Sequence, residues 1–261
     1  MIRWIKLLTK ETVREARKLV AVTFLTMLLT FLNLTNEIHL GEQSCSFLSI
    51  ADILISSSHV IVYGFGYIPL LLFLVQNISK YDFYSEILIK ARSRSSLWGY
   101  SCMKLVVFSA VCTLAILIIN IFIGSFYVES FINWSERDSY YYSVVHITNQ
   151  NVCFMQVALR YYFILVLRSM SIGMIFKVCT FLSGKNYLSW GLIICYICYS
   201  AFYTQSSGLF CSNMTVGYSY WSHITFENSY LGILITIAFL VIVYSYGYLH
   251  MREKDFLNEN K

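Results

Sequence analysis

Few side chains in this sequence have the types and spacing that catalysis or metal binding requires. Cys195 and Cys198 form a C-x-x-C pair, which binds zinc or performs thiol redox chemistry when a second pair or a histidine accompanies it. This pair lies inside an apolar run without such companions, so we interpret it as packing. The five histidines share no metal-ligand spacing, and neither an H-E-x-x-H motif nor a phosphate-binding G-x-x-x-x-G-K-[ST] loop occurs. We therefore predict a protein that is not an enzyme and has no metal site or cofactor of its own.

Two arginines interrupt an apolar run that is long enough to be a helix. A charge in hydrocarbon costs about 2.5–3.5 kcal/mol on insertion scales, so Arg160 and Arg168 should face protein, water or an interface. On a helical wheel they share an arc with Gln156, Tyr161 and Ser171. Two interpretations stay open. Either this polar stripe lines a translocation path or a dimer seam, or Arg160 extends to the interface while Arg168 is paired inside the bundle or lies nearer the end of the span.

The composition is that of an integral membrane protein. Of the 261 residues, 57% are hydrophobic and 13% are charged, and the mean hydropathy is +0.62. Soluble proteins carry roughly 25% charged residues. At about 20 apolar residues per crossing, residues 1–261 form a single transmembrane domain of about six helices. We predict an all-α membrane protein with spans at about Leu19 to Leu34, Val60 to Asn77, Tyr100 to Phe126, Phe154 to Ile175, Tyr187 to Tyr203 and Tyr230 to Leu249.

The segment 1–18 has a pattern of its own. Its basic and apolar side chains fall on opposite arcs of a helical wheel, and its basic residues are too many and too spread out for a signal peptide. We predict an amphipathic helix that lies in the cytoplasmic interface. The alternative is an ordinary basic flank of the first span.

Charge is distributed by membrane side. With six spans both termini share one side, which carries nearly all of the 19 Lys and Arg residues, while Arg137 lies in an opposite loop. The positive-inside rule makes the terminal side cytoplasmic, and it explains the net charge of +5 without a nucleic-acid partner. The predicted outer loops are residues 35–59, 127–153 and 204–229, and residues 47–54 are apolar enough to dip back into the interface.

The predicted outer face is acidic. It carries Glu37, Glu42, Asp52, Glu129, Glu136, Asp138 and Glu227. Such a face would attract cations or cationic peptides. The alternative is that basic residues are simply excluded from this side, which requires no ligand.

The cytoplasmic connection at residues 79–98 combines a short helix-like run with exposed cations. Its cations, Lys90, Arg92 and Arg94, are available to an acidic or polar groove of a partner. Trp98 and Lys104 follow, and they are predicted to anchor the third span at the interface. The alternative is a basic loop that only satisfies the positive-inside rule.

With this loop, the six-span plan and the N-terminal amphipathic helix, the chain resembles the membrane-spanning permease subunits of type-2 ABC exporters. The resemblance is to the small Firmicute permeases of bacteriocin and lantibiotic export or immunity, on a loop in which Glu86 and Lys90 precede Arg92-Ser93-Arg94 and Trp98. It implies that residues 79–98 form a coupling helix that docks on a separate ATP-binding cassette ATPase, and that the contact is made by Glu86, Lys90, Arg92 and Arg94.

The resemblance also implies the partners. These are two copies of the ATPase, which would supply ATP and Mg, a second permease in a homodimer or heterodimer, and a peptide substrate such as an antimicrobial peptide or bacteriocin. The location implied is the bacterial plasma membrane. Two alternatives remain: a membrane immunity protein that sequesters a peptide without transporting it, and a channel or secondary carrier. Against the carrier, no inverted repeat or Gly/Pro-broken helix pair is recognisable.

Overall fold

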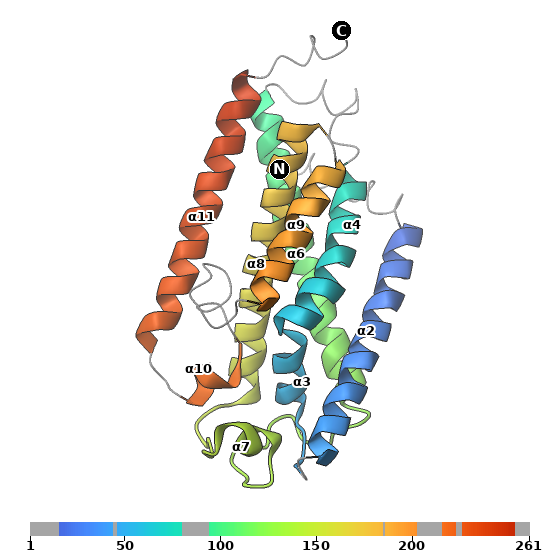
Figure 1. Cartoon of the computed structure of the whole chain (residues 1–261), viewed down its shortest axis with the longest axis vertical. Helices are drawn as coiled ribbons and strands as arrows, with labels where there is room; N and C mark the ends of the chain where they lie inside the picture. Colours follow the sequence, from blue (N-terminus) through green and yellow to red (C-terminus); the bar gives the residue numbers. More distant parts are fainter. Residues whose placement is uncertain are drawn as a thin grey trace.

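Long apolar runs fold into helices that cross most of the molecule (Figure 1). The structure is a computed structural model, and it describes residues 16–43, 46–79, 94–184, 186–202, 216–222 and 226–253. The described helices are α2 (Ala16–Gln43), α3 (Ile50–Ser57), η1 (Val60–Tyr67), α4 (Ile68–Ser79), α6 (Arg94–Gly124), α7 (Tyr140–Val145), α8 (Phe154–Ser183), α9 (Asn186–Phe202), α10 (Tyr218–Ser222) and α11 (Phe226–Glu253). Within these ranges the structure is all-helical apart from one isolated bridge between Phe47 and Ser139.

The predicted all-helical fold is confirmed for the described residues, and the long apolar helices indicate a multi-pass membrane protein. Among the described residues, five segments are long and apolar enough to span a membrane: Val20–Gln43, Val60–Asn77, Ser96–Gly124, Phe154–Ser183 and Ile233–His250. They coincide with five of the six predicted spans. The other predicted span corresponds to α9, which has 17 residues, so the count of six requires that α9 also crosses. The predicted N-terminal helix over residues 1–18 lies almost entirely outside the described residues.

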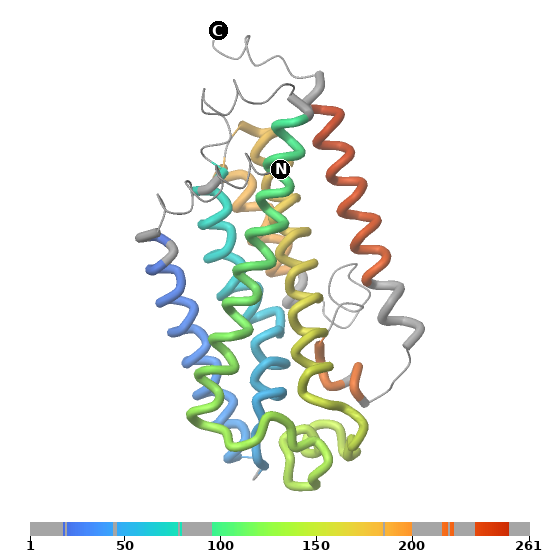
Figure 2. The backbone as a smooth tube through the Cα atoms, turned by 180° about the vertical axis from the view of Figure 1, so that it is seen from behind, coloured from blue at the N-terminus to red at the C-terminus, as the bar shows by residue number. Residues whose placement is uncertain are grey.

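The helices run alternately up and down the bundle. The start of α2 and the end of α11 lie at the same end, which we call the terminal end, and α7 and α10 lie at the opposite, distal end (Figure 1). Helix α8 is central and packs against α6, α9 and α11. Seen from behind, α6 runs the length of the bundle between α2 and α8 (Figure 2). Single helices therefore connect the terminal end of the bundle to the distal end.

The prediction of an outer loop at residues 35–59 is wrong. Helix α2 continues to Gln43, and α3 lies inside the bundle with nearly every residue buried. The polar residues that suggested a loop in the sequence form hydrogen bonds between α2 and α3. Ser56 Oγ lies 2.6 Å from Glu37 Oε1 and 3.1 Å from Asn33 Oδ1, and its single hydroxyl hydrogen donates to one of these two acceptors at a time. Because these partners replace water, the helix continues past its apolar stretch.

The second crossing begins with a π-helix, η1, which continues directly into α4. Its last turn is closed by a bond from the Ile68 amide to the Tyr63 carbonyl, five residues back. The next residue, Pro69, is the sole proline in the chain, and it has no amide hydrogen and clashes with an ordinary i−4 carbonyl. The wider π turn accommodates this ring. It also brings Gly64 against Ile197 of α9, with no room for a side chain.

Candidate functional site

Helix α8 holds the turn between α3 and η1 through polar bonds in the middle of the bundle. The Tyr161 hydroxyl lies 3.0 Å from Ser57 Oγ, and Arg168 Nη1 donates to the Ser58 carbonyl at 2.9 Å. In the other direction, Tyr63 Oη donates to the Leu165 carbonyl at 3.0 Å. The side chains of Tyr63, Tyr161 and Arg168 are buried. These bonds fix the helix break that precedes the π-helix.

The five residues of the predicted polar stripe are not gathered into one site. Tyr161 and Arg168 meet at the α3–η1 turn, whereas the Arg160 guanidinium lies over the Tyr220 ring of α10, 3.2 Å from its centroid. Gln156 caps its own helix, because its Oε1 accepts from the Cys153 amide, and the Ser171 hydroxyl donates to the carbonyl one turn back. Tyr161, Arg168 and Ser171 are buried within this chain, so a second chain would not contact them in this packing.

Arg168 gives the first testable prediction. We expect Arg168→Met to lower the free energy of unfolding by about 1–3 kcal/mol, because it leaves the buried Ser58 carbonyl without its guanidinium donor. Phe163→Met is the matched control, since Phe163 is on the same helix and 60% exposed, and we expect no change there. The measurement is thermal unfolding of both purified variants in a mild detergent. Equal or greater stability of Arg168→Met would show that burying this charge costs more than its bonds return.

The distal end carries a second polar centre, around Asp52 of α3. Its side chain is completely buried. Oδ2 accepts from the Ser49 amide at 2.8 Å and from the Ser49 hydroxyl at 2.6 Å. Oδ1 accepts from Trp134 Nε1 and from the Tyr218 hydroxyl, each at 2.9 Å. One carboxylate therefore joins three separate segments of the chain.

We call the described residues over this end, 127–153 and 216–222, the distal cap. Trp134 stacks on Tyr141 with ring centroids 4.6 Å apart, and Tyr218 and Trp221 pack against Trp134. The first two amides of α3, which have no partner inside the helix, donate to the carbonyls of residues 130 and 131. The cap thus completes the N-terminus of α3 and covers Asp52.

Burial of Asp52 changes its electrostatics. Loss of water raises the pKa of the Asp52 carboxyl, and its hydrogen bonds from Ser49, Tyr218 and Trp134 oppose that rise. Burial and the neighbouring Asp52 carboxylate raise the pKa of the Tyr218 hydroxyl, so Tyr218 remains a donor. The prediction that Asp52 and Glu37 belong to an acidic outer face is wrong, because both are bonded inside the bundle. The described acids that remain exposed at this end include Glu129, Glu136 and Asp138.

The residues predicted at the cytoplasmic interface are only partly described. Glu86, Lys90 and Arg92 lie outside the described residues, and Arg94 is the first residue of α6. Trp98 is 3% exposed, and its Nε1 donates to the Tyr244 carbonyl of α11 at 3.1 Å. Its contacts are thus between helices, and its predicted anchoring role stays a prediction.

Two lysines near the terminal end are also buried. The Lys104 ammonium lies 5.1 Å from the centroid of the Tyr100 ring, one turn away on α6. Lys177 of α8 donates to the Ser101 carbonyl at 2.8 Å. Protein groups therefore surround both cations in place of water.

The cysteine pair shows no metal-site geometry. Cys195 and Cys198 are free thiols on α9. Across the described ranges, no group of three or more His, Cys, Asp or Glu residues could hold a metal ion. Searches against protein-family models, curated proteins and solved structures find no match to this chain. A functional assignment therefore depends on the chain's own residues and their arrangement.

Proposed function

We propose that this chain is the membrane-spanning permease subunit of an ATP-binding cassette exporter. In this proposal two copies of a soluble ATPase bind at the terminal end and hydrolyse ATP with Mg. The chain pairs with a second permease, identical or homologous, and moves a peptide-like substrate outward. The terminal end faces the cytoplasm of a bacterial cell.

The observation that carries the proposal is the charge difference between the two ends. The connection between α4 and α6 contains Lys80, Lys90 and Arg92, and it joins two helix ends at the terminal end (Figure 1). Arg94 and Arg252 lie on helix turns at that same end. The distal cap, by contrast, carries one basic residue, Arg137, among exposed acids. This asymmetry supports a cytoplasmic terminal end, where a soluble ATPase would dock.

The long helices provide a route for coupling. Helix α6 has 31 residues, or about 46 Å of length, and its first residue, Arg94, directly follows the proposed ATPase-binding connection. Its last residue, Gly124, lies against Ile53 and Ile50 of α3, next to Asp52 and the cap. A shift of α6 that ATP binding favours would therefore reach the distal end directly. ATP would act by stabilising one of two helix packings.

The exposed acids of the cap support a cationic peptide as the substrate. Glu129, Glu136 and Asp138 are exposed at the proposed outer face. Their field would concentrate cations near the cap, and added salt would weaken that attraction.

Charge reversal in the connection tests the proposed ATPase contact. We expect the double variant Arg92→Glu and Arg94→Glu to reduce recovery of the ATPase with the tagged chain at least tenfold, because attraction becomes repulsion. Insertion into the membrane should be unchanged. The control Arg92→Lys and Arg94→Lys keeps both charges and should retain most of the complex. Equal recovery of the ATPase with the glutamate and lysine variants would contradict the assignment of this connection.

A further inference from the structure

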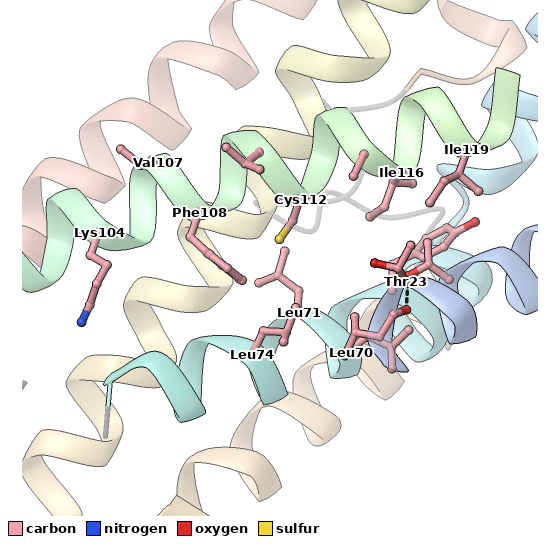
Figure 3. A pocket seen from close by; sticks show the side chains of 15 residues that line it. Thr23, Leu70, Leu71, Leu74, Lys104, Val107, Phe108, Cys112, Ile116 and Ile119 are labelled. Carbon is pink, nitrogen blue, oxygen red and sulfur yellow. Dashed lines mark hydrogen bonds between the residues drawn. The ribbon is translucent and has the colours of Figure 1, made fainter. Parts of the chain in front are cut away.

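A lateral groove lies between α2, α4 and α6. It has a volume of about 300 Å³ and is lined almost entirely by apolar side chains (Figure 3). This volume is at the lower end of the range for small-molecule sites. Its lining residues Thr23 of α2 and Val107, Val111 and Ala115 of α6 are exposed. The groove therefore opens sideways, toward the hydrocarbon of the membrane.

The polarity of the groove is concentrated at one end. Lys104 is the one charged residue among those that line it, and Figure 3 shows it at one extreme, beyond Val107 and Phe108. Other lining hydroxyls have partners within the protein: Thr26 donates to the Val22 carbonyl, and Tyr67 bonds to Thr30. An ammonium has three N–H donors, so Lys104 can bind an anion in addition to its other contacts.

A second cation lies at the same end. Lys18 Nζ donates to Asn77 Oδ1 at 2.7 Å, which links α2 to α4. Lys18 is four residues before the lining residue Val22, and Asn77 is three residues after the lining residue Leu74. Residues at these spacings share a helix face, so the Lys18–Asn77 bond lies one turn beyond the groove, toward the terminal end. The groove is thus lined by apolar side chains along most of its length, and two lysines, Lys104 and Lys18, flank its terminal end.

We propose that this groove binds one acyl chain of an anionic phospholipid from the leaflet at the terminal end. The phosphate binds Lys104 and Lys18, and the acyl chain runs between α4 and α6 toward Ile119. Charge complementarity selects an anionic headgroup, and the lateral opening gives access from the bilayer. The proposal is independent of ATP-driven transport, because it requires only this chain and a membrane.

The test uses the full-length protein in nanodiscs that contain equal amounts of phosphatidylglycerol and phosphatidylcholine with the same acyl chains. After release into a mild detergent, native mass spectrometry counts the retained lipids. We expect retained phosphatidylglycerol to exceed phosphatidylcholine at least tenfold. Lys104→Gln should reduce this preference to less than twofold.

A pair of neighbouring variants tests the location. Ala115→Phe places a ring in the groove and should reduce phosphatidylglycerol retention at least fivefold. Leu114→Phe, on the adjacent and 45% exposed position outside the groove, should leave retention unchanged. Ala115 is exposed, so this pair remains informative if Lys104→Gln does not fold. Equal retention of the two lipids by the wild-type protein would overturn the proposed preference for an anionic headgroup. Equal retention of phosphatidylglycerol by the two phenylalanine variants would overturn the proposed binding in this groove.

Discussion

Asp52→Ala is expected to lower the free energy of unfolding by about 3–5 kcal/mol, the largest single effect among the distal residues. The substitution removes the acceptor for Trp134, for Tyr218 and for both donors of Ser49, all at a fully buried position. Buried donors that lose a charged acceptor retain their full desolvation cost. The measurement is thermal unfolding in a mild detergent, together with the summed emission of the five tryptophans, to which Trp134 contributes.

Two further variants separate this effect from simple loss of negative charge. Asp52→Asn preserves shape but has one acceptor oxygen in place of two, so we expect an intermediate loss of stability. Glu129→Ala removes an exposed acid of the same cap and should have no measurable effect. Wild-type stability and unchanged emission in Asp52→Ala would contradict the central role of this carboxylate.

Gly247→Ala is expected to cost about 2–3 kcal/mol and to separate α11 from α6. A Cβ atom at Gly247 would overlap the Trp98 indole, whose Nε1 donates to the Tyr244 carbonyl of the same helix. Overpacking of this kind typically costs 1–3 kcal/mol. Helix α11 is otherwise little buried, since 11% of the residues in its most apolar stretch, within Ile233–His250, are buried in the described structure. The measurement is unfolding in detergent, with protease sensitivity of α11 as a second readout.

A matched glycine and a compensating substitution complete this experiment. Gly191→Ala on α9 meets open space, and we expect it to be neutral or to stabilise by up to about 1 kcal/mol. The double variant Gly247→Ala with Trp98→Phe should lose less stability than the sum of its single changes, because the smaller ring makes room for the methyl group. Additive losses would show that Gly247 and Trp98 are not in contact.

The helical class and the positions of the apolar spans could be predicted because they depend on local hydropathy. The end of α2 could not be predicted in this way. Asn33 and Glu37 are polar in sequence, and they continue the helix because Ser56 lies opposite them in the fold. The start of α3 had a usable local signal. Ser49 and Asp52 form a capping box ahead of an apolar run, and the structure contains that box at the start of α3.

The polar residues of α8 show what a helical wheel can and cannot determine. The wheel placed Arg160 and Arg168 on one polar arc, and in the structure one lies over the Tyr220 ring while the other is bonded to the Ser58 carbonyl. It did not distinguish a shared pathway from separate contacts, because both place polar groups on one arc. That distinction depends on α3 and α10, whose positions follow from packing between distant parts of the chain.

The proposed exporter depends most directly on its soluble partner. The decisive measurement is to solubilise the tagged full-length chain gently from its native membrane and to identify by mass spectrometry what is recovered in stoichiometric amount. We expect a soluble ATP-binding protein that contains a phosphate-binding loop, with a second permease if the dimer is heterologous. Recovery of this chain alone in several mild detergents would contradict the exporter and favour a protein that sequesters its peptide or acts as a channel.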